Sequence, residues 1–367
     1  MVPLTGAAAV GTAVGPRTVL LGPGPARTPA PVPASVDEAL RDLPEWPGDL
    51  LPGHGATLRL WELLATLAAD DLAVARTVEP HLDALAILDQ ARPVRVDGDA
   101  RPFSTWGVFA AQTPTARLDA TRAPGEPWRL DGTKPWCSLA ARLDAALVTA
   151  RLPGEGDDQG LFAVDLRVAG IEHVPAPWAS RGLQEIPSTP LRFVDVPAQL
   201  VRDGDWYVQR PGFWWGAIGV AACWYGGAVG VARRVFDEAA RRPDDRLLAM
   251  HLGAIDERLS AARLLLAHAA AAVDSSGAAT DHGRDAEGPA ERVAGRILAK
   301  RVRANVARTC EDVLRAAGHA LGPGPLTQED AYAKRVSDLQ VYVRQQHAER
   351  DDASLGAALV GDGRAPW

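Results

Sequence analysis

Apolar residues recur at helical spacing through the first quarter of the chain. Ser35 and Glu38 have the spacing of a capping box, ahead of a short helix expected to end near Leu43. A further helix is expected over about Val78 to Gln90. Between these helices, the apolar positions at helical spacing are Leu60, Leu63, Leu64, Leu67 and Val74. Residues 35–100 are therefore predicted to form an N-terminal helical domain. Residues 1–34, which precede it, are expected to be a flexible arm or one held only by residues 19–21.

The pattern changes at Val94 to short apolar runs separated by turns, and residues 101–205 are predicted to form a β-domain. The last of these runs ends near Val196-Pro197, and the Asp-Gly at 131–132 predicts a hairpin turn. Strands are expected over Trp106–Ala110, Trp128–Leu130, Ala145–Thr149, Gly160–Val164, Ile171–Val174 and Leu191–Val194. Because no helix-length segment separates them, we expect a compact antiparallel barrel or sandwich.

Residues 206–367 return to helical periodicity. Helices are expected over 213–239, from about Leu248 to Val273, over 291–317 and over 330–347, with a loop between 274 and 289. Four such helices predict a C-terminal four-helix bundle. The uncharged stretch 213–232 is long enough to span a bilayer, but its glycines and the lack of a second such stretch favour a buried bundle helix. The predicted fold class is α+β multidomain, ordered helical domain, β-domain, bundle.

Composition narrows the functional classes. The chain has 367 residues, a net charge of −7 and 23% charged residues, so we expect a globular protein that binds no nucleic acid. Its three cysteines are far apart, which predicts neither disulfides nor a metal site and suits a reducing cytoplasm. The first residues lack the basic region of a signal peptide. We expect a soluble cytoplasmic protein with no membrane attachment.

A rigid corner at residues 134–138 carries the first candidate for chemistry. Trp136 offers a large flat ring and Ser138 a hydroxyl, which together could bracket a planar cofactor. From these residues alone, a core tryptophan with a turn serine explains the corner as well.

The same corner resembles the acyl-CoA dehydrogenase family. Its hallmark is a glycine, a lysine, a tryptophan and a hydroxyl residue at alternate positions, and these are Gly132, Lys134, Trp136 and Ser138 here, followed by Asp144 and an apolar strand. The resemblance extends over residues 35–356 and includes the order of the three domains. It implies an FAD cofactor, with Trp136 against the flavin ring and Ser138 helping to hold it.

The resemblance implies further contacts and partners. Gln112 and Thr113 stand where the family contacts the flavin edge, although the usual Glu-Pro and Gly-Ser steps are replaced. Gly318, His319 and Gly322 resemble the flavin diphosphate loop, with His319 at a glycine position, where it is either a phosphate donor or a helix cap. The family implies a homodimer or homotetramer, an acyl-CoA or other acyl substrate and an electron-transfer partner.

The base position departs most from the family. In the commonest family arrangement, a glutamate lies eight residues after an Arg-Asp pair, which here is Arg335 and Asp338, but that position is Gln346, whose amide is not basic. His347 could accept a proton, or it could be the end of a solvated helix, and Glu349 or Asp351 could reach in. Three hypotheses follow: an FAD-dependent dehydrogenase of acyl thioesters, a flavin monooxygenase of the same fold that uses His347, and a catalytically silent scaffold.

Overall fold

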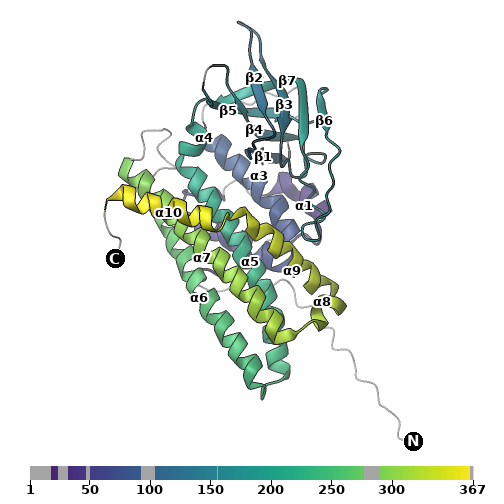
Figure 1. Cartoon of the computed structure of the whole chain (residues 1–367), viewed down its shortest axis with the longest axis vertical. Helices are drawn as coiled ribbons and strands as arrows, with labels where there is room; N and C mark the ends of the chain where they lie inside the picture. Colours follow the sequence, from purple (N-terminus) through teal and green to yellow (C-terminus); the bar gives the residue numbers. More distant parts are fainter. Residues whose placement is uncertain are drawn as a thin grey trace, which may run out of the picture.

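The computed structural model describes residues 18–23, 32–46, 50–91, 104–154, 156–276, 289–363 and 367. Its helices are α1 (Val36–Asp42), η1 (Leu43–Glu45), α2 (Thr57–Asp70), α3 (Leu72–Gln90), α4 (Trp206–Gln209), α5 (Pro211–Arg241), α6 (Arg246–Ser275), α7 (Pro289–Leu321), α8 (Gly324–Gln328), α9 (Asp330–Tyr342), η2 (Val343–Gln345) and α10 (Glu349–Asp362). Its strands are β1 (Trp106–Phe109), β2 (Leu118–Thr121), β3 (Trp128–Lys134), β4 (Ala145–Arg151), β5 (Gln159–Asp165), β6 (Ile171–His173) and β7 (Leu191–Arg202). The strands gather at one end of an elongated molecule and the long helices run away from them (Figure 1).

The N-terminal helices follow their predicted caps with one correction. The Ser35 hydroxyl accepts a hydrogen bond from the Glu38 backbone N–H at 3.2 Å and begins α1. The helix expected to begin near Val78 instead begins at Leu72, because the Asp71 carboxylate accepts hydrogen bonds from the backbone N–H groups of Ala73 and Val74. Of the expected arm, residues 1–17 and 24–31 lie outside the described part, while the backbone N–H of buried Val19 donates to Thr66 Oγ1.

The seven strands form one sheet that closes on itself. Five of them make the ring β4-β2-β3-β7-β5, which the pairing of β4 with β5 closes, and β6 lies outside on β7. β1 pairs with β4 in parallel, from Trp106 opposite Ala145 to Phe109 opposite Val148. The expectation of a purely antiparallel sheet was therefore wrong. β4 is buried along nearly its whole length because the ring encloses one face and α3 covers strand β1 beside it.

The predicted hairpin at Asp131-Gly132 was also wrong. Both residues lie inside β3, which pairs with β2 on one side and β7 on the other. Gly132 has φ +124° at a shift of register, so the dipeptide forms a bulge. A Cβ there would lie 2.2 Å from the Arg117 carbonyl oxygen, which explains the glycine without a turn.

α5 lies at the centre of the long helices and contacts α2, α6, α7 and α9. Gly226 and Gly230 face α2, where added Cβ atoms would lie 2.1 Å from the Ala65 oxygen and 2.5 Å from the Ala69 oxygen. These small residues let the two backbones approach closely, which suits the buried bundle helix that the sequence predicted. By length and composition α5 could cross a membrane, but 78% of its apolar window is buried inside the protein, as expected of a core helix.

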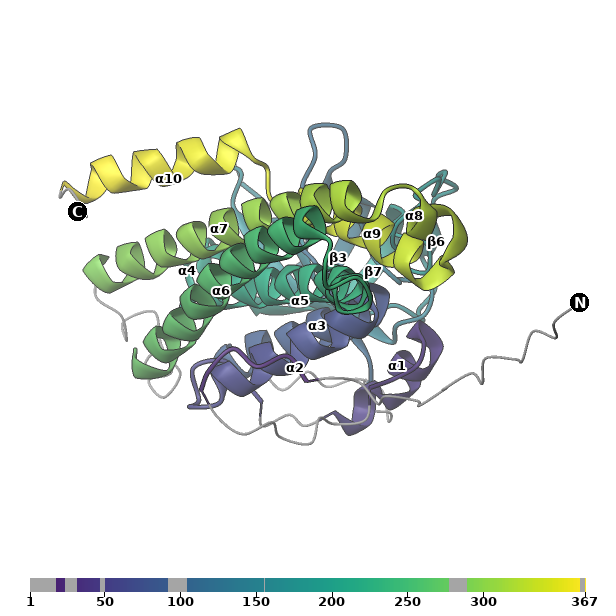
Figure 2. The ribbon, with the colours of Figure 1, turned by 90° about the horizontal axis from the view of Figure 1, so that it is seen from below.

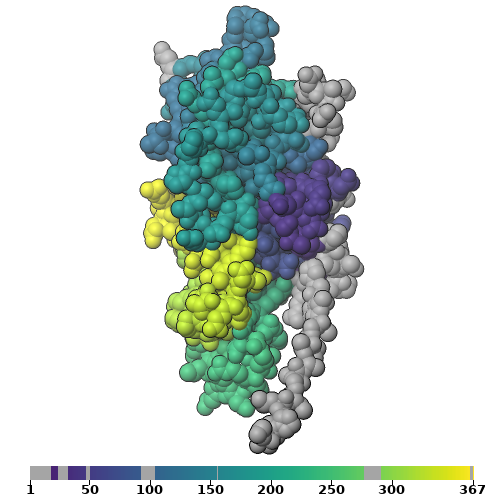
Figure 3. All heavy atoms as spheres, turned by 90° about the vertical axis from the view of Figure 1, so that its right-hand side faces the viewer, coloured from purple at the N-terminus to yellow at the C-terminus, as the bar shows by residue number. Residues whose placement is uncertain are grey.

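The C-terminal helices pack around α5. α6 and α7 lie against α5, and α9, which follows α8, packs against α5 and α3 (Figure 2). In the space-filling view this C-terminal segment lies below the β-domain (Figure 3). The loop expected between 274 and 289 falls mainly outside the described residues. α10 was not anticipated as a separate helix; it lies on the outer side of α7 and has no buried residue (Figure 2).

Candidate functional site

At the corner formed by residues 134–138, the backbone is strained and the Trp136 ring points toward solvent. Trp136 has φ +57° and Leu139 φ +56°, a left-handed conformation that is rare for large residues. The backbone N–H groups of Cys137 and Leu139 donate to the Thr189 and Pro187 oxygens, which keeps the corner in place. The Trp136 side chain is 57% exposed. It is therefore not the core tryptophan of the simpler interpretation, and strain of this kind is typical of sites that bind.

Ser138 is connected to the N-terminal helices through Arg76 on α3. Arg76 Nη2 donates to Ser138 Oγ at 3.2 Å, and Ser138 Oγ lies 2.7 Å from Ser188 Oγ. The Arg76 guanidinium also lies over the Tyr342 ring, 5.8 Å from its centroid, and 3.6 Å from Glu79 Oε2. The hydroxyl predicted to hold a flavin is thus oriented by an arginine that the sequence analysis did not single out.

α3 carries a stripe of polar side chains on the face that meets α5, of which Glu79 is buried and the others are half-buried. Its members, spaced by three, four and seven residues, are Arg76, Glu79, Asp83 and Gln90. Burial raises the pKa of Glu79 to about 7, with Arg76 opposing the shift, and burial also raises the pKa of Asp83. A carboxyl with a pKa near neutrality can hold or release a proton at physiological pH.

Arg210, at the start of α5, completes this stripe. Its Nη1 donates to Gln90 Oε1 at 3.0 Å, its Nη2 lies 3.7 Å from Asp83 Oδ1, and its guanidinium lies 5.3 Å from the Tyr207 ring centroid. Gly216 on α5 makes room for the carboxylate, since a Cβ there would lie 2.8 Å from Asp83 Oδ1. The glycines of α5 therefore serve the polar stripe as well as the helix packing.

Gln112 lines a pocket of about 250 Å³ between the ends of β1 and β4 and the start of α5. Tyr207 and Phe213 form its aromatic side, and Thr149 lies on its strand side. The buried Lys134 Nζ donates to Thr149 O and Oγ1, both at 2.7 Å, and so joins this pocket to the corner two residues further on. Thr113 does not line the pocket; its hydroxyl lies 3.4 Å from that of Thr115.

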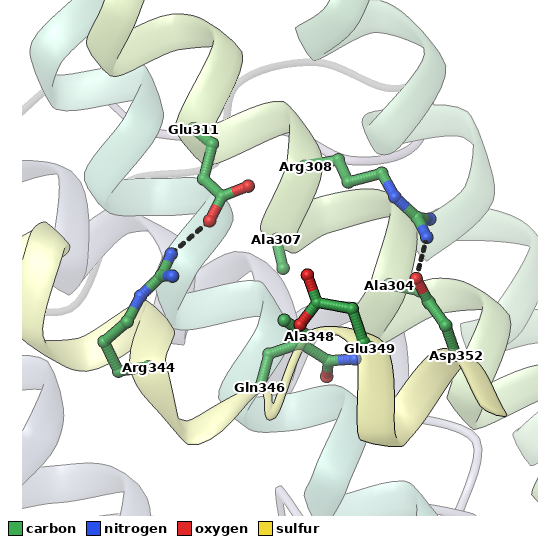
Figure 4. A pocket seen from close by; sticks show the side chains of 9 residues that line it. All are labelled: Ala304, Ala307, Arg308, Glu311, Arg344, Gln346, Ala348, Glu349 and Asp352. Atoms are coloured by element: carbon green, nitrogen blue, oxygen red, sulfur yellow. Dashed lines mark hydrogen bonds and ion pairs between the residues drawn. The ribbon is translucent and has the colours of Figure 1, made fainter. Parts of the chain in front are cut away.

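Gln346 lines a second pocket of about 150 Å³ between α7 and α10 (Figure 4). Its side chain is buried, and within the described residues its Oε1 has no hydrogen-bond partner. Two ion pairs flank it, Arg344 with Glu311 and Arg308 with Asp352. The Glu349 carboxylate points into the space between them (Figure 4).

His347 does not line this pocket. Its side chain is 66% exposed, and Nδ1 lies 3.7 Å from Asp351 Oδ1. Its backbone N–H donates to Asp351 Oδ2 at 2.9 Å, which fixes the start of α10. Of the two residues predicted to be catalytic, the structure therefore places Gln346 in a pocket and His347 at the surface.

Arg303 on α7 links the Gln346 pocket to the Arg76 network. Its Nη2 donates to the Gln345 carbonyl at 3.0 Å, and its guanidinium lies 4.6 Å from the Trp224 ring centroid. Trp224 packs edge to face against Tyr342, the ring below Arg76. Ser138 and Gln346, predicted separately, thus lie at two ends of one chain of contacts. Arg76, Glu79 and Arg303, the inner members of this chain of contacts, were not predicted from the sequence. For Arg76 and Glu79 the available signal was two opposite charges one turn apart on a largely apolar helix.

The segment predicted to be a diphosphate loop is the end of α7. Gly318 and His319 are exposed residues of this helix, and Gly322 ends it with φ +65° while its N–H donates to the Gly318 oxygen. The His319 ring packs edge to face against His251 at 5.9 Å. Because a helix end presents carbonyl groups, this segment does not offer free N–H groups to a diphosphate.

No family model and no curated protein matches the chain, but solved structures do. KijD3 in complex with dTDP has a TM-score of 0.72 at 18% identity, over 89% of this chain and 88% of its own. Dibenzothiophene monooxygenase TdsC from Paenibacillus sp. A11-2 has 0.69 at 17%, over 84% and 83%. Methanesulfinate monooxygenase MsuC from Pseudomonas fluorescens has 0.69 at 16%, over 90% and 96%. The chain has the acyl-CoA dehydrogenase fold. At these identities the likeness shows the fold alone.

Several proteins of this fold were crystallised with flavins. TdsC was solved with FMN, KijD3 with FMN and a dTDP-linked amino sugar, and XiaF from Streptomyces sp. with FADH2. Among the described residues, no group of three or more histidine, cysteine, aspartate or glutamate side chains is arranged to hold a metal ion.

Proposed function

We propose that this protein is a flavin-dependent monooxygenase. The observation that carries the proposal is Gln346: a neutral amide, buried and with a free carbonyl oxygen, stands where thioester dehydrogenation requires a carboxylate base. Support also comes from the exposed Trp136 ring and the oriented Ser138 hydroxyl, which suit a flat flavin ring. When bound, reduced flavin would supply electrons for the reaction FMNH⁻ + O₂ + S + H⁺ → FMN + SO + H₂O, where S is the substrate.

The chain's own residues have distinct tasks in this proposal. Trp136 covers one face of the ring, Ser138 donates to its edge, and the Gln346 oxygen accepts a hydrogen bond from the substrate or cofactor. The pocket of Gln112, with Tyr207 and Phe213, suits a small uncharged substrate that carries an aromatic or apolar body.

FMN is favoured over the predicted FAD. The Gly318–Gly322 segment ends a helix, where the partial charge is negative and repels a diphosphate. FMN needs no such contact. The cytoplasmic location and the homodimer or homotetramer stay predictions.

The decisive experiment mixes the purified protein with anaerobically reduced FMN or FAD and then with oxygen and a panel of small aromatic and sulfur compounds. We expect substrate-dependent oxygen incorporation, detected by mass spectrometry with labelled O₂. Flavin reoxidation that yields only hydrogen peroxide with every compound, or no flavin uptake at all, contradicts the proposal.

Dehydrogenation of an acyl thioester is the second candidate, and Glu349 supports it. Its carboxylate points into the Gln346 pocket and could act as the missing base (Figure 4). In that case anaerobic acyl-CoA should bleach the oxidised flavin, and Glu349→Gln should abolish bleaching while leaving flavin affinity unchanged. Under our proposal acyl-CoA leaves the flavin spectrum unaltered.

Replacing Trp136 by alanine should weaken flavin binding without unfolding the protein. Loss of one aromatic stacking face, worth up to about 1.5 kcal/mol, raises the Kd by roughly tenfold. The melting temperature should not fall, because the ring is mostly exposed. Fluorescence titration with FMN measures the Kd. Trp367→Ala, at an exposed ring outside the site, is the matched control, and an equal Kd in both variants would remove Trp136 from the site.

A further inference from the structure

A small cavity lies between the polar stripe of α3 and the glycines of α5. It has a volume of about 20 Å³, and Glu79 and Asp83 line it together with Trp61, Trp215 and Gly216. A cavity of this size holds one water molecule, and the two carboxyl groups give that water polar partners. Carboxyls one helical turn apart that share a water can exchange a proton.

Glu79 is the buried member of this pair that faces the proposed flavin site. Its side chain is nearly fully buried, and Arg76 Nη1 is 3.6 Å away. Arg76 in turn donates to Ser138 Oγ, so a single residue separates Glu79 from the Trp136 corner. The titratable and charged groups that face Glu79 are Arg76 and Asp83 from α3, Tyr207 from α4, Cys223 from α5, Arg303 from α7 and Tyr342 from α9.

Tyr342 places a buried hydroxyl beside Glu79 and Cys223. Within the described residues neither contact reaches full hydrogen-bond geometry, and the Tyr342 ring lies below the Arg76 guanidinium. A buried hydroxyl without a partner costs stability. A water or ligand that bridges it to Glu79 would remove that cost.

On its other side the pair reaches the Gln112 pocket. Asp83 lies 3.7 Å from Arg210, and Arg210 lies over Tyr207, which lines that pocket. The polar stripe therefore connects the Trp136 corner with the Gln112 pocket through the protein interior.

We propose that Glu79 holds the proton that the oxygenation reaction consumes and, with Tyr342 and a water bound against Asp83, supplies it to the flavin site. This inference rests on the proposed monooxygenase function. In each turnover the Glu79 carboxyl loses one proton, which ends in the water released, and it recovers that proton from solvent by way of Asp83. The Tyr342 hydroxyl, which can both accept and donate a proton, passes the proton on, while the Arg76 guanidinium stays protonated and only orients Ser138.

The protonation of Glu79 can be measured without flavin. Infrared difference spectra of the apo protein with isotope-labelled glutamate should show a carboxyl that titrates near pH 7. Glu79→Gln should remove this band, whereas Glu126→Gln, at an exposed turn, should leave it. Asp83→Asn should lower the midpoint, because Asp83 raises the pKa of Glu79. A glutamate spectrum that titrates only near pH 4.5 overturns the inference, even if the protein is a monooxygenase.

The pH dependence of stability is an independent test of the raised pKa of Glu79. The folded protein binds a proton at Glu79 between pH 4.5 and about 7 that the unfolded chain does not bind, so this group's contribution to stability falls as pH rises through that window. The melting temperature of wild type minus that of Glu79→Gln should decrease from pH 5 to pH 8 and stay constant above pH 8. A constant difference across this range contradicts the inference.

Turnover with reduced FMN links the titration to function. Glu79→Gln should lower the rate roughly 100-fold with little change in the Kd for FMN. Tyr342→Phe should lower the rate while keeping the infrared band. Full activity in both variants overturns the proton role. If wild type shows no flavin reaction, the proposed function fails. An infrared carboxyl band that titrates near pH 7 would still show that Glu79 carries the proton.

Discussion

Valine at position 226 should prevent the chain from folding. Even a single added Cβ at Gly226 would lie 2.1 Å from the Ala65 carbonyl oxygen, and that oxygen belongs to the backbone of α2. α2 and α5 cannot move apart at Gly226 without also breaking the close contact one turn later, between Gly230 and Ala69. Overpacking of a core costs roughly 1–3 kcal/mol when side chains can shift, and more against rigid backbone, out of a total stability of about 5–15 kcal/mol.

Circular dichroism and urea denaturation measure this effect. Gly253→Ala on α6 is the matched control, because nothing lies within 4 Å of an added Cβ there. Alanine at 253 should stabilise the protein by about 0.5–1 kcal/mol through its better helix propensity. A cooperative Gly226→Val protein as stable as wild type would mean that α2 and α5 do not pack as described.

Loss of the Arg210 side chain should destabilise the protein by about 3–5 kcal/mol. Arg210 is buried, and its removal leaves Asp83 without its cationic neighbour and Gln90 without its donor. Because burial already raises the pKa of Asp83, this carboxyl can take up a proton at low pH. The penalty for Arg210→Ala should therefore be larger at pH 8 than at pH 5.

A double variant distinguishes the cost of an unpaired Asp83 charge from the cost of losing the packing of the Arg210 side chain. Asp83→Asn combined with Arg210→Ala has no buried charge to leave unpaired, so it should recover part of the loss at pH 8. Urea denaturation of the two single variants and the double variant gives the coupling energy. If the losses simply add at both pH values, Asp83 and Arg210 do not form a pair.

Some elements could be predicted because their cause is local. The capping serine of α1 and the apolar repeats of α6 depend on neighbours within one or two turns. The parallel pairing of β1 with β4 depends on residues 39 positions apart, and no local alternation reveals it. Gly132 was misjudged for the same reason, since Arg117, the residue that requires the glycine, lies just before β2, 15 residues away along the chain.

The candidate site residues also differ in whether their cause is local. Trp136 and Ser138 belong to one contiguous motif and could be identified from the sequence. The raised pKa of Glu79 comes mainly from burial against α5 and α9, which the folded chain brings together. Arg76 was lost because the expected helix began two residues after it.

α10 closes the Gln346 pocket, yet no residue of this helix is buried. Polar contacts attach it to α7, where Arg308 pairs with Asp352 and Lys300 Nζ donates to Ser354 Oγ at 2.8 Å. Ala348 joins it to the rest of the chain with φ +45°, a strained conformation that detachment would relieve. Attractions of this kind are screened by dissolved ions, unlike apolar packing. We therefore expect higher ionic strength to loosen α10 and expose Gln346 while the core of the protein stays folded.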